Sequence, residues 1–201
     1  NNLMRIRGDG NVGIGTTSPQ QLLHVNGGAA DTTVQITNSV SGSAATDGFS
    51  LTVENPSGDV NMRNREATNM RFYTSNDEKM RIDSSGRLLV GKQNTGLGNA
   101  GHEFGADGYF YHTRAGDLMW LNRTGSPGTY ITFMKDGGTI GKLGLETSGL
   151  HLDGESSHAG LKFFASAIGP RQNYADVDAT VDLGWTSGRF KDIYASGTVY
   201  A

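Results

Sequence analysis

The glycine-rich segment near the start of the chain could bind a phosphate group. Residues 8–13, Gly-Asp-Gly-Asn-Val-Gly, fit the G-x-G-x-x-G pattern of dinucleotide sites. Such a site needs a helix that begins at the loop, because the N-terminal amides of that helix hold the pyrophosphate. Here residues 14–19 are Ile-Gly-Thr-Thr-Ser-Pro, which favour turns. We therefore expect a tight hairpin turn at this position rather than a nucleotide site.

Three aspartates near the C-terminal end are spaced like part of a calcium loop: Asp176, Asp178 and Asp182. An EF-hand needs glycine at the sixth position and a distal glutamate. Val181 stands at the sixth position, and no such glutamate follows. The pattern favours a solvated turn.

A second group of potential metal ligands comprises His151, Asp153, Glu155 and His158. Imidazole and carboxylate groups together suit zinc and related ions. In a strand the first three would share a face, but Gly154 and the two serines that follow Glu155 favour a loop. We predict no metal site and no cofactor.

The chain carries no recognisable catalytic motif. It has no cysteine, which excludes thiol catalysis, disulfides and Cys-bound zinc. It also lacks a G-x-S-x-G nucleophile elbow and an H-E-x-x-H zinc motif. Paired carboxylates of a glycosidase are recognised by their separation in space, which a sequence does not specify. We predict that this chain is not an enzyme.

Aromatic residues gather between Phe104 and Phe133. Tyr and Trp offer rigid area with a polar tip, which suits the C–H faces and hydroxyls of sugars. Strand alternation would send Tyr109 and Tyr111 to one face and Phe110 to the other. The cluster is either the core of this region or a receptor surface, and one set of alternating residues could serve each role. The candidate receptor-binding residues are Tyr109, Tyr111, His112, Arg114, Trp120 and Tyr130.

The elements that would position these residues are short strands. Glycine makes up 30 of 201 residues and recurs about every seventh position, the interval of a short strand and its turn. Apolar residues between the glycines alternate, as Val34 and Ile36 or Leu150 and Leu152 do. The glycine-free stretch 59–85 keeps the same period and is also predicted to form strands. The composition thus predicts an all-β protein.

The charge balance gives no indication of nucleic-acid binding or of an anionic membrane as partner. The formal net charge is −3, and no half of the chain is basic. The longest apolar run, Leu118–Leu121, is far too short for a membrane span.

One pattern occurs twice, 76 residues apart. Met4-Arg5-Ile6, Gly10 and Ile14-Gly15 correspond to Met80-Arg81-Ile82, Gly86 and Val90-Gly91. Each copy predicts a strand, a tight glycine turn and a second strand. A lone hairpin is marginal in water, so such units need neighbours, and association between chains would supply them.

These segments resemble the repeats of bacteriophage tail fibres. The resemblance covers roughly residues 4–25 and 70–91, and it is most specific at 182–201, with Asp182-Leu183-Gly184-Trp185, Arg189-Phe190-Lys191-Asp192-Ile193-Tyr194 and Ser196-Gly197-Thr198-Val199. The last segment is similar to the region that precedes the self-cleaving intramolecular chaperone of L-shaped or side tail fibres. Residues 92–181 resemble tail-fibre sequences only in general character, without a matching motif.

The resemblance implies an intertwined homotrimeric fibre of short antiparallel strands, with β-prism or triple β-helix segments. It implies attachment of a virion to a bacterial surface, with polysaccharide as the expected receptor; a segment of a glycan-degrading tailspike is the alternative. It also implies that Ala201 is the residue left at the chaperone cut. We expect a hairpin-repeat region at 1–91, an aromatic-rich head at 92–168 and a trimeric strand region at 169–201. The residues expected to pack between chains are Leu183, Trp185, Phe190, Ile193 and Tyr194.

Overall fold

The computed structural model describes residues 4–147, 149–192, 194 and 196–197. These residues form seventeen β-strands and no helix, so the predicted all-β class is confirmed. Accordingly, the described part of the chain holds no helix that could cross a membrane. The chain divides into two compact units, 1–118 and 119–201, which are considered separately below.

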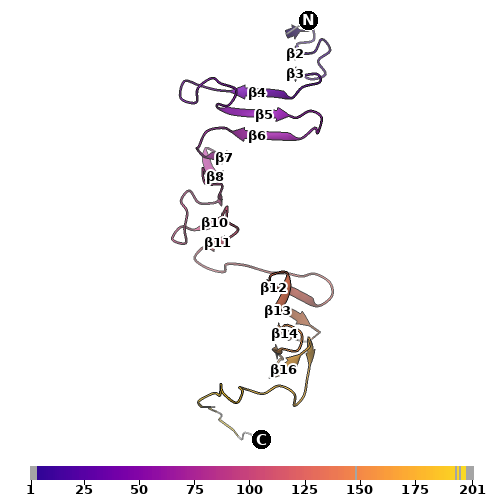
Figure 1. The fold of residues 1–201 in the computed structure, drawn as a ribbon, viewed down its shortest axis with the longest axis vertical. Coiled ribbons are helices and arrows are strands. Elements are labelled where there is room, and N and C mark those ends of the chain that lie inside the picture. Colours follow the sequence, from indigo (N-terminus) through magenta and orange to yellow (C-terminus); the bar gives the residue numbers. More distant parts are fainter. Residues whose placement is uncertain (1–3, 148, 193, 195, 198–201) are drawn as a thin grey trace. The chain divides into compact units, whose positions relative to one another are not determined.

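The first unit contains three sheets whose strands follow one another in chain order (Figure 1). The first sheet holds β1 (Met4–Ile6), β2 (Val12–Ile14) and β3 (Leu23–Val25). The second holds β4 (Thr32–Ile36), β5 (Phe49–Val53) and β6 (Val60–Asn64). The third holds β7 (Met70–Thr74), β8 (Asp77–Ile82), β9 (Leu88–Val90), β10 (Gly101–Phe104) and β11 (Phe110–Thr113). Neighbouring strands are antiparallel except β2 and β3, which are parallel.

The second unit contains one six-stranded antiparallel meander. Its strands are β12 (Gly128–Lys135), β13 (Gly138–Glu146), β14 (Gly149–Gly154), β15 (Ala159–Phe163), β16 (Ile168–Gln172) and β17 (Ala175–Asp176). Two irregularities interrupt the pairing of β12 with β13. Such bulges bend a strand and increase its twist.

The repeated sequence pattern forms two hairpins with the same register. Met4 pairs with Ile14 in the first copy, and Met80 pairs with Val90 in the second. At the turns, Gly10 and Gly86 have φ values of 89° and 79°, in the left-handed region that glycine adopts without a steric penalty. The G-x-G-x-x-G segment is therefore a hairpin turn, as predicted from its sequence.

A third turn of the same kind connects β10 and β11, although the sequence pattern does not include it. The amide of Gly105 donates to the carbonyl of Tyr109, and the amide of Gly108 donates to the carbonyl of Gly105. The turns at Gly10 and Gly86 have the equivalent pair of bonds. Gly108 supplies the positive φ, 94°.

The predicted segment boundaries do not coincide with the edges of the sheets. The boundary at 91/92 lies between β9 and β10, which pair with each other in the five-stranded sheet. The boundary at 168/169 lies inside β16. The division between the compact units falls at 118/119, after the last strand of that sheet. Side-chain alternation shows where strands are but not which of them pair.

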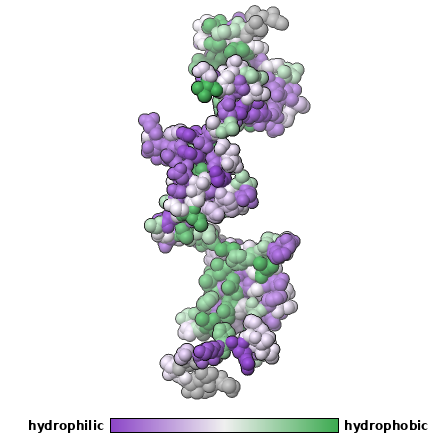
Figure 2. Space-filling model, turned by 60° about the vertical axis from the view of Figure 1, so that its left-hand side comes forward, coloured by the Kyte–Doolittle hydropathy of each residue, from purple (hydrophilic) through white to green (hydrophobic). Residues whose placement is uncertain are grey.

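Burial in this chain is inverted relative to an ordinary globular domain. Leu89 is the one large apolar side chain buried among the described residues, whereas the buried polar residues include Lys92, Glu103, Lys162 and Arg171. Large apolar side chains are instead exposed in every sheet. Figure 2 shows them gathered on the visible face of the second unit. A single copy therefore has polar interiors and apolar surfaces.

Candidate functional site

In the six-stranded sheet the apolar side chains form two rows across the strands. The first row follows the pairing of β13, β14, β15 and β16 and consists of Leu145, Leu150, Phe163 and Ile168. The second row adds β12 and consists of Ile131, Leu143, Leu152, Leu161 and Pro170. Leu150, Leu152, Leu161, Phe163 and Ile168 are 44–64% exposed. An apolar face this wide is unusual on a monomer.

The sheets of the first unit show the same inversion. In the five-stranded sheet the rows are Met70, Ile82, Leu88, Phe104 and Phe110, and beside them Phe72, Met80, Val90, His102 and His112. In the sheet of β4, β5 and β6, the row is Val34, Leu51 and Met62, each more than 40% exposed, while Ser50 and Thr52 on the opposite face are buried. Each sheet thus presents an apolar face that its own chain leaves open.

Opposite the apolar rows of the second unit lies a buried charged cluster centred on Arg171. The guanidinium donates through Nε to Oδ1 of Asp153 at 2.7 Å and through Nη1 to Glu146 at 2.7 Å and to Asp176 at 2.5 Å. Nη2 donates to the carbonyl of Tyr174 at 2.6 Å. Burial by itself lowers the pKa of Arg171, but the bonds to Asp153 and Glu146 outweigh it and raise the pKa further above its usual range.

Lys162 completes this cluster from β15. Its ammonium donates to Asp176 at 2.9 Å and to Glu146 at 3.2 Å, and only 5% of its side chain is exposed. The bond to Asp176, followed by that to Glu146, raises the pKa of Lys162. The bond from Lys162 lowers the pKa of Asp176, and the bond from Arg171 lowers the pKa of Glu146. Arg171, Lys162, Glu146 and Asp176 are therefore held in their ionised forms.

The corresponding face of the five-stranded sheet holds a smaller polar cluster around Glu103. Lys92 pairs with its carboxylate at 2.9 Å, and both side chains are 1% exposed. The hydroxyl of Tyr109 and the amide of Gly96 also donate to it, at 2.5 and 2.8 Å. These bonds, of which that from Tyr109 is the strongest, lower the pKa of Glu103 to about 2. The same bond raises the pKa of Tyr109.

The candidate receptor residues of the first unit are divided between the two faces of the five-stranded sheet and the segment after β11. Tyr109 and Tyr111 stack at 4.4 Å between ring centroids, on the same face as Glu103. His112 lies on the apolar face, where its ring stacks on His102 at 4.0 Å, so the expected alternation is confirmed. Burial, followed by the charges of His102 and Arg114, lowers the pKa of His112. Arg114 follows β11 and donates to the carbonyl of Ala115.

Trp120 and Tyr130 belong to the second unit rather than to the first. Trp120 is 82% exposed and precedes β12, whereas Tyr130 is half-buried within that strand. The candidate residues therefore divide between the two units. Of the aromatic residues in this set, Trp120 is the most exposed.

The residues predicted to pack between chains are exposed in a single copy. Leu183, Trp185, Phe190 and Tyr194 are 62–93% exposed. Trp185 forms an isolated antiparallel bridge with Gly188, where its ring lies so close that a Cβ at Gly188 would overlap it. Ile193 and Ala201 lie outside the described residues.

The candidate metal ligands have different structural roles. The Nδ1 atom of His151 lies 2.9 Å from Asp153 on the charged face of β14, without an aligned hydrogen bond. Glu155 follows the end of this strand and lies 3.5 Å from His158. Asp176 is an ion-pair partner of Lys162 and Arg171 rather than part of a solvated turn. Within the described residues, no three His, Asp or Glu side chains are arranged to hold a metal ion.

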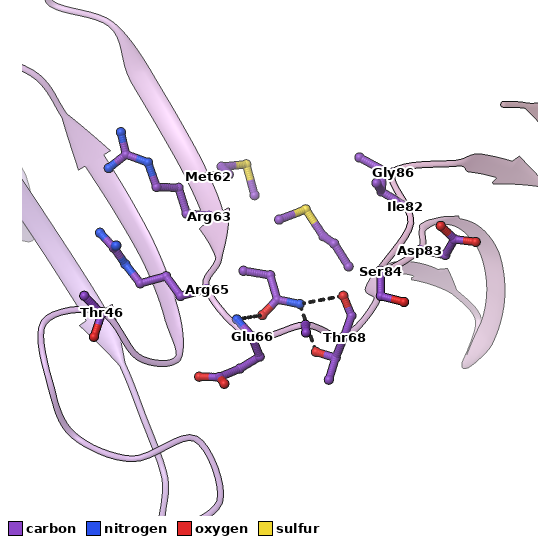
Figure 3. Close-up of a pocket in the computed structure, with 13 residues that line it drawn as sticks. Thr46, Met62, Arg63, Arg65, Glu66, Thr68, Ile82, Asp83, Ser84 and Gly86 are labelled. Atoms are coloured by element: carbon purple, nitrogen blue, oxygen red, sulfur yellow. Dashed lines mark hydrogen bonds between the residues drawn. The ribbon is translucent and has the colours of Figure 1, made fainter. Parts of the chain in front are cut away.

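A cavity of about 630 Å³ in the first unit lies beside the connection between β6 and β7 (Figure 3). Its polar groups hold the backbone. Asn64 donates to the carbonyl and hydroxyl of Thr68 at 3.2 and 3.1 Å, and Asp83 accepts from Arg87. In Figure 3, Arg63 and Arg65 extend away from Met62. Asn64 and Asp83 in this cavity thus hold the neighbouring turns in place.

The charged clusters are the part of the site that motif analysis missed. Their members stand at alternate positions of strands that otherwise carry leucine, as in Leu150-His151-Leu152-Asp153 and Leu161-Lys162-Phe163. This alternation of charged with apolar residues is the sequence pattern from which the charged clusters could have been predicted. It does not show that the charged face of the sheet is the buried one.

Comparison with known proteins does not assign the chain to a family. No family model matches it, and no significant match was found among curated proteins or solved structures.

Proposed function

We propose that this chain is a segment of a homotrimeric bacteriophage tail fibre that attaches the virion to polysaccharide on a bacterial surface. The support is twofold: the resemblance of residues 4–25, 70–91 and 182–201 to fibre sequences, and the open apolar face of each sheet. The number of chains, the location in the virion and the class of receptor in this proposal come from the resemblance. The open apolar faces support the association of chains, because association would cover them.

The observation that carries the proposal is the exposure of the apolar rows in the sheets. Within their own sheets, the row residues Leu150, Leu152, Leu161, Phe163, Ile168, Val34, Leu51 and Met62 are 41–64% exposed. Because much of the exposed area is apolar, association with further copies of the chain would remove it from water.

Attachment in such a fibre relies on many weak contacts. Three chains present each receptor residue three times, and several fibres act together, so avidity exceeds the affinity of one site. Trp120 is the best single candidate for a receptor contact because the residue is largely exposed. Tyr109 is a poor choice for mutation, because its hydroxyl also supports the buried Glu103.

Sedimentation equilibrium and binding to a panel of immobilised bacterial polysaccharides together test this function. We expect a mass three times that of the 21.4 kDa chain and retention on at least one polysaccharide. Trp120→Ala should reduce that retention without changing the mass. A stable monomer would contradict the proposed fibre architecture. A trimer that is retained on none of the polysaccharides would contradict the proposed attachment.

A further inference from the structure

A small cavity opens on the charged face of the second unit, beside the Arg171 cluster. Its volume is about 240 Å³, and its walls include Lys142, Glu146, His151, Arg171 and Tyr174. Typical ligand pockets measure about 300–1,000 Å³. This cavity is therefore the size for one ring or one end group rather than an extended chain.

The backbone at Tyr174 is held in an unfavourable conformation. Asn173 and Tyr174 form the two-residue turn between β16 and β17, with φ values of 54° and 64°. Turns with two positive φ values favour Asn-Gly, and a bulky aromatic residue at the second position is strained. Strained backbone of this kind clusters at active sites and ligand clamps. Here the ring of Tyr174 forms a wall of the cavity, with the Lys142 ammonium 4.2 Å from its centroid.

His151 also lines the cavity, and it has room there because residue 144 is glycine. A Cβ at Gly144 would lie 2.8 Å from Nε2 of the imidazole. The residue is 7% exposed, and its Nδ1 atom lies 2.9 Å from Oδ2 of Asp153. The glycine therefore allows the imidazole to line the cavity.

The hydrogen-bonding groups around the cavity indicate the charge of its ligand. Arg171 already donates to Asp153, Glu146, Asp176 and the Tyr174 carbonyl, so little of its charge remains for an anion. Lys142 is a further donor at the cavity, and Glu146, whose side chain is 43% exposed, is an acceptor. Positive and negative groups are balanced. Hydroxyl groups, which both donate and accept, fit this lining better than a carboxylate or a phosphate.

From this geometry we infer that the cavity is a binding site for one neutral pyranose unit of a polysaccharide, with Tyr174 against the sugar ring and Glu146, His151 and Lys142 toward its hydroxyls. None of the six receptor candidates is among the residues that line this cavity. All of its lining residues belong to one chain.

Ligand-observed saturation-transfer NMR on the full chain tests the site. The probes are the methyl glycosides of glucose, galactose, mannose, rhamnose and N-acetylglucosamine, with glucuronate and inorganic phosphate as charged comparisons. We expect at least one neutral glycoside to bind with a Kd below 50 mM. Tyr174→Gly should weaken that binding at least tenfold, and Tyr174→Phe should retain it.

The glycine variant separates binding from folding. Because glycine suits the turn, Tyr174→Gly should keep or raise the melting temperature while binding is lost. Asn76→Gly is the matched control, since Ser75 and Asn76 form a turn of the same kind, with φ values of 52° and 64°; it should leave binding unchanged. Binding of none of the neutral glycosides, binding of the charged probes alone, or binding that survives Tyr174→Gly would each overturn the site. None of these outcomes depends on trimer formation or on cell attachment.

Discussion

Arg171 on β16 donates a hydrogen bond of 2.7 Å to Glu146 at the end of β13, although β14 and β15 lie between these strands. Strands in a flat sheet are about 4.8 Å apart and their side chains stand roughly perpendicular to the sheet, so two side chains three strands apart would not meet. The sheet must therefore curve toward its charged face. This curvature buries the charges and opens the rows of leucine on the other side.

Replacing Arg171 by leucine should destabilise the second unit by about 3–5 kcal/mol, because Asp153 would remain buried without its partner. Double replacement of Arg171 and Asp153 by leucine should recover part of this loss. Urea unfolding followed by tryptophan fluorescence measures both. A loss below about 1 kcal/mol for the single variant would show that the cluster is hydrated.

Acid should weaken the first unit through Glu103. Its pKa is about 2 in the folded chain against a usual 4.5. Because the folded pKa is the lower one, the stabilisation is present above about pH 4.5 and is lost as the pH falls toward 2. The difference corresponds to about 3 kcal/mol. Glu103→Gln should flatten the dependence of the urea midpoint on pH in this range. If the slope is unchanged in the variant, the pH dependence arises from other carboxylates.

The turn between β1 and β2 permits a matched test of backbone conformation. At both Gly8 and Gly10 a Cβ would meet open space, but only Gly10 has a positive φ. Gly10→Ala should cost about 1–2 kcal/mol and accelerate amide exchange in β1 and β2 by roughly 5–30-fold. Gly8→Ala should have little effect. Equal effects of the two variants would contradict the conformational explanation.

A charge in the apolar rows should prevent association without unfolding the sheet. Leu161 is 46% exposed in the single chain, so lysine at this position has room there but not between packed copies. We expect Leu161→Lys to sediment as a smaller species with unchanged circular dichroism. Lys135→Glu, at the exposed β12–β13 turn, is the control and should leave the mass unaltered. If both variants keep the wild-type mass, this face is not the interface.

The sequence by itself determined the local structure, because strand period and turn chemistry depend on neighbouring residues. The spacing of glycine predicted short strands, and the Met-Arg-Ile repeat predicted two hairpins, which share one register. The alternation of Tyr109, Phe110 and Tyr111 across a strand was predictable for the same reason.

Only the tertiary structure decided which face is buried and which distant residues meet. Alternation assigns Leu161 and Lys162 to opposite faces but does not say toward which face the sheet curves. Glu146 and Arg171 are 25 residues apart and have no shared motif. They meet because a curved meander brings the side chains of strands that are not neighbours together, and no local pattern specifies that curvature.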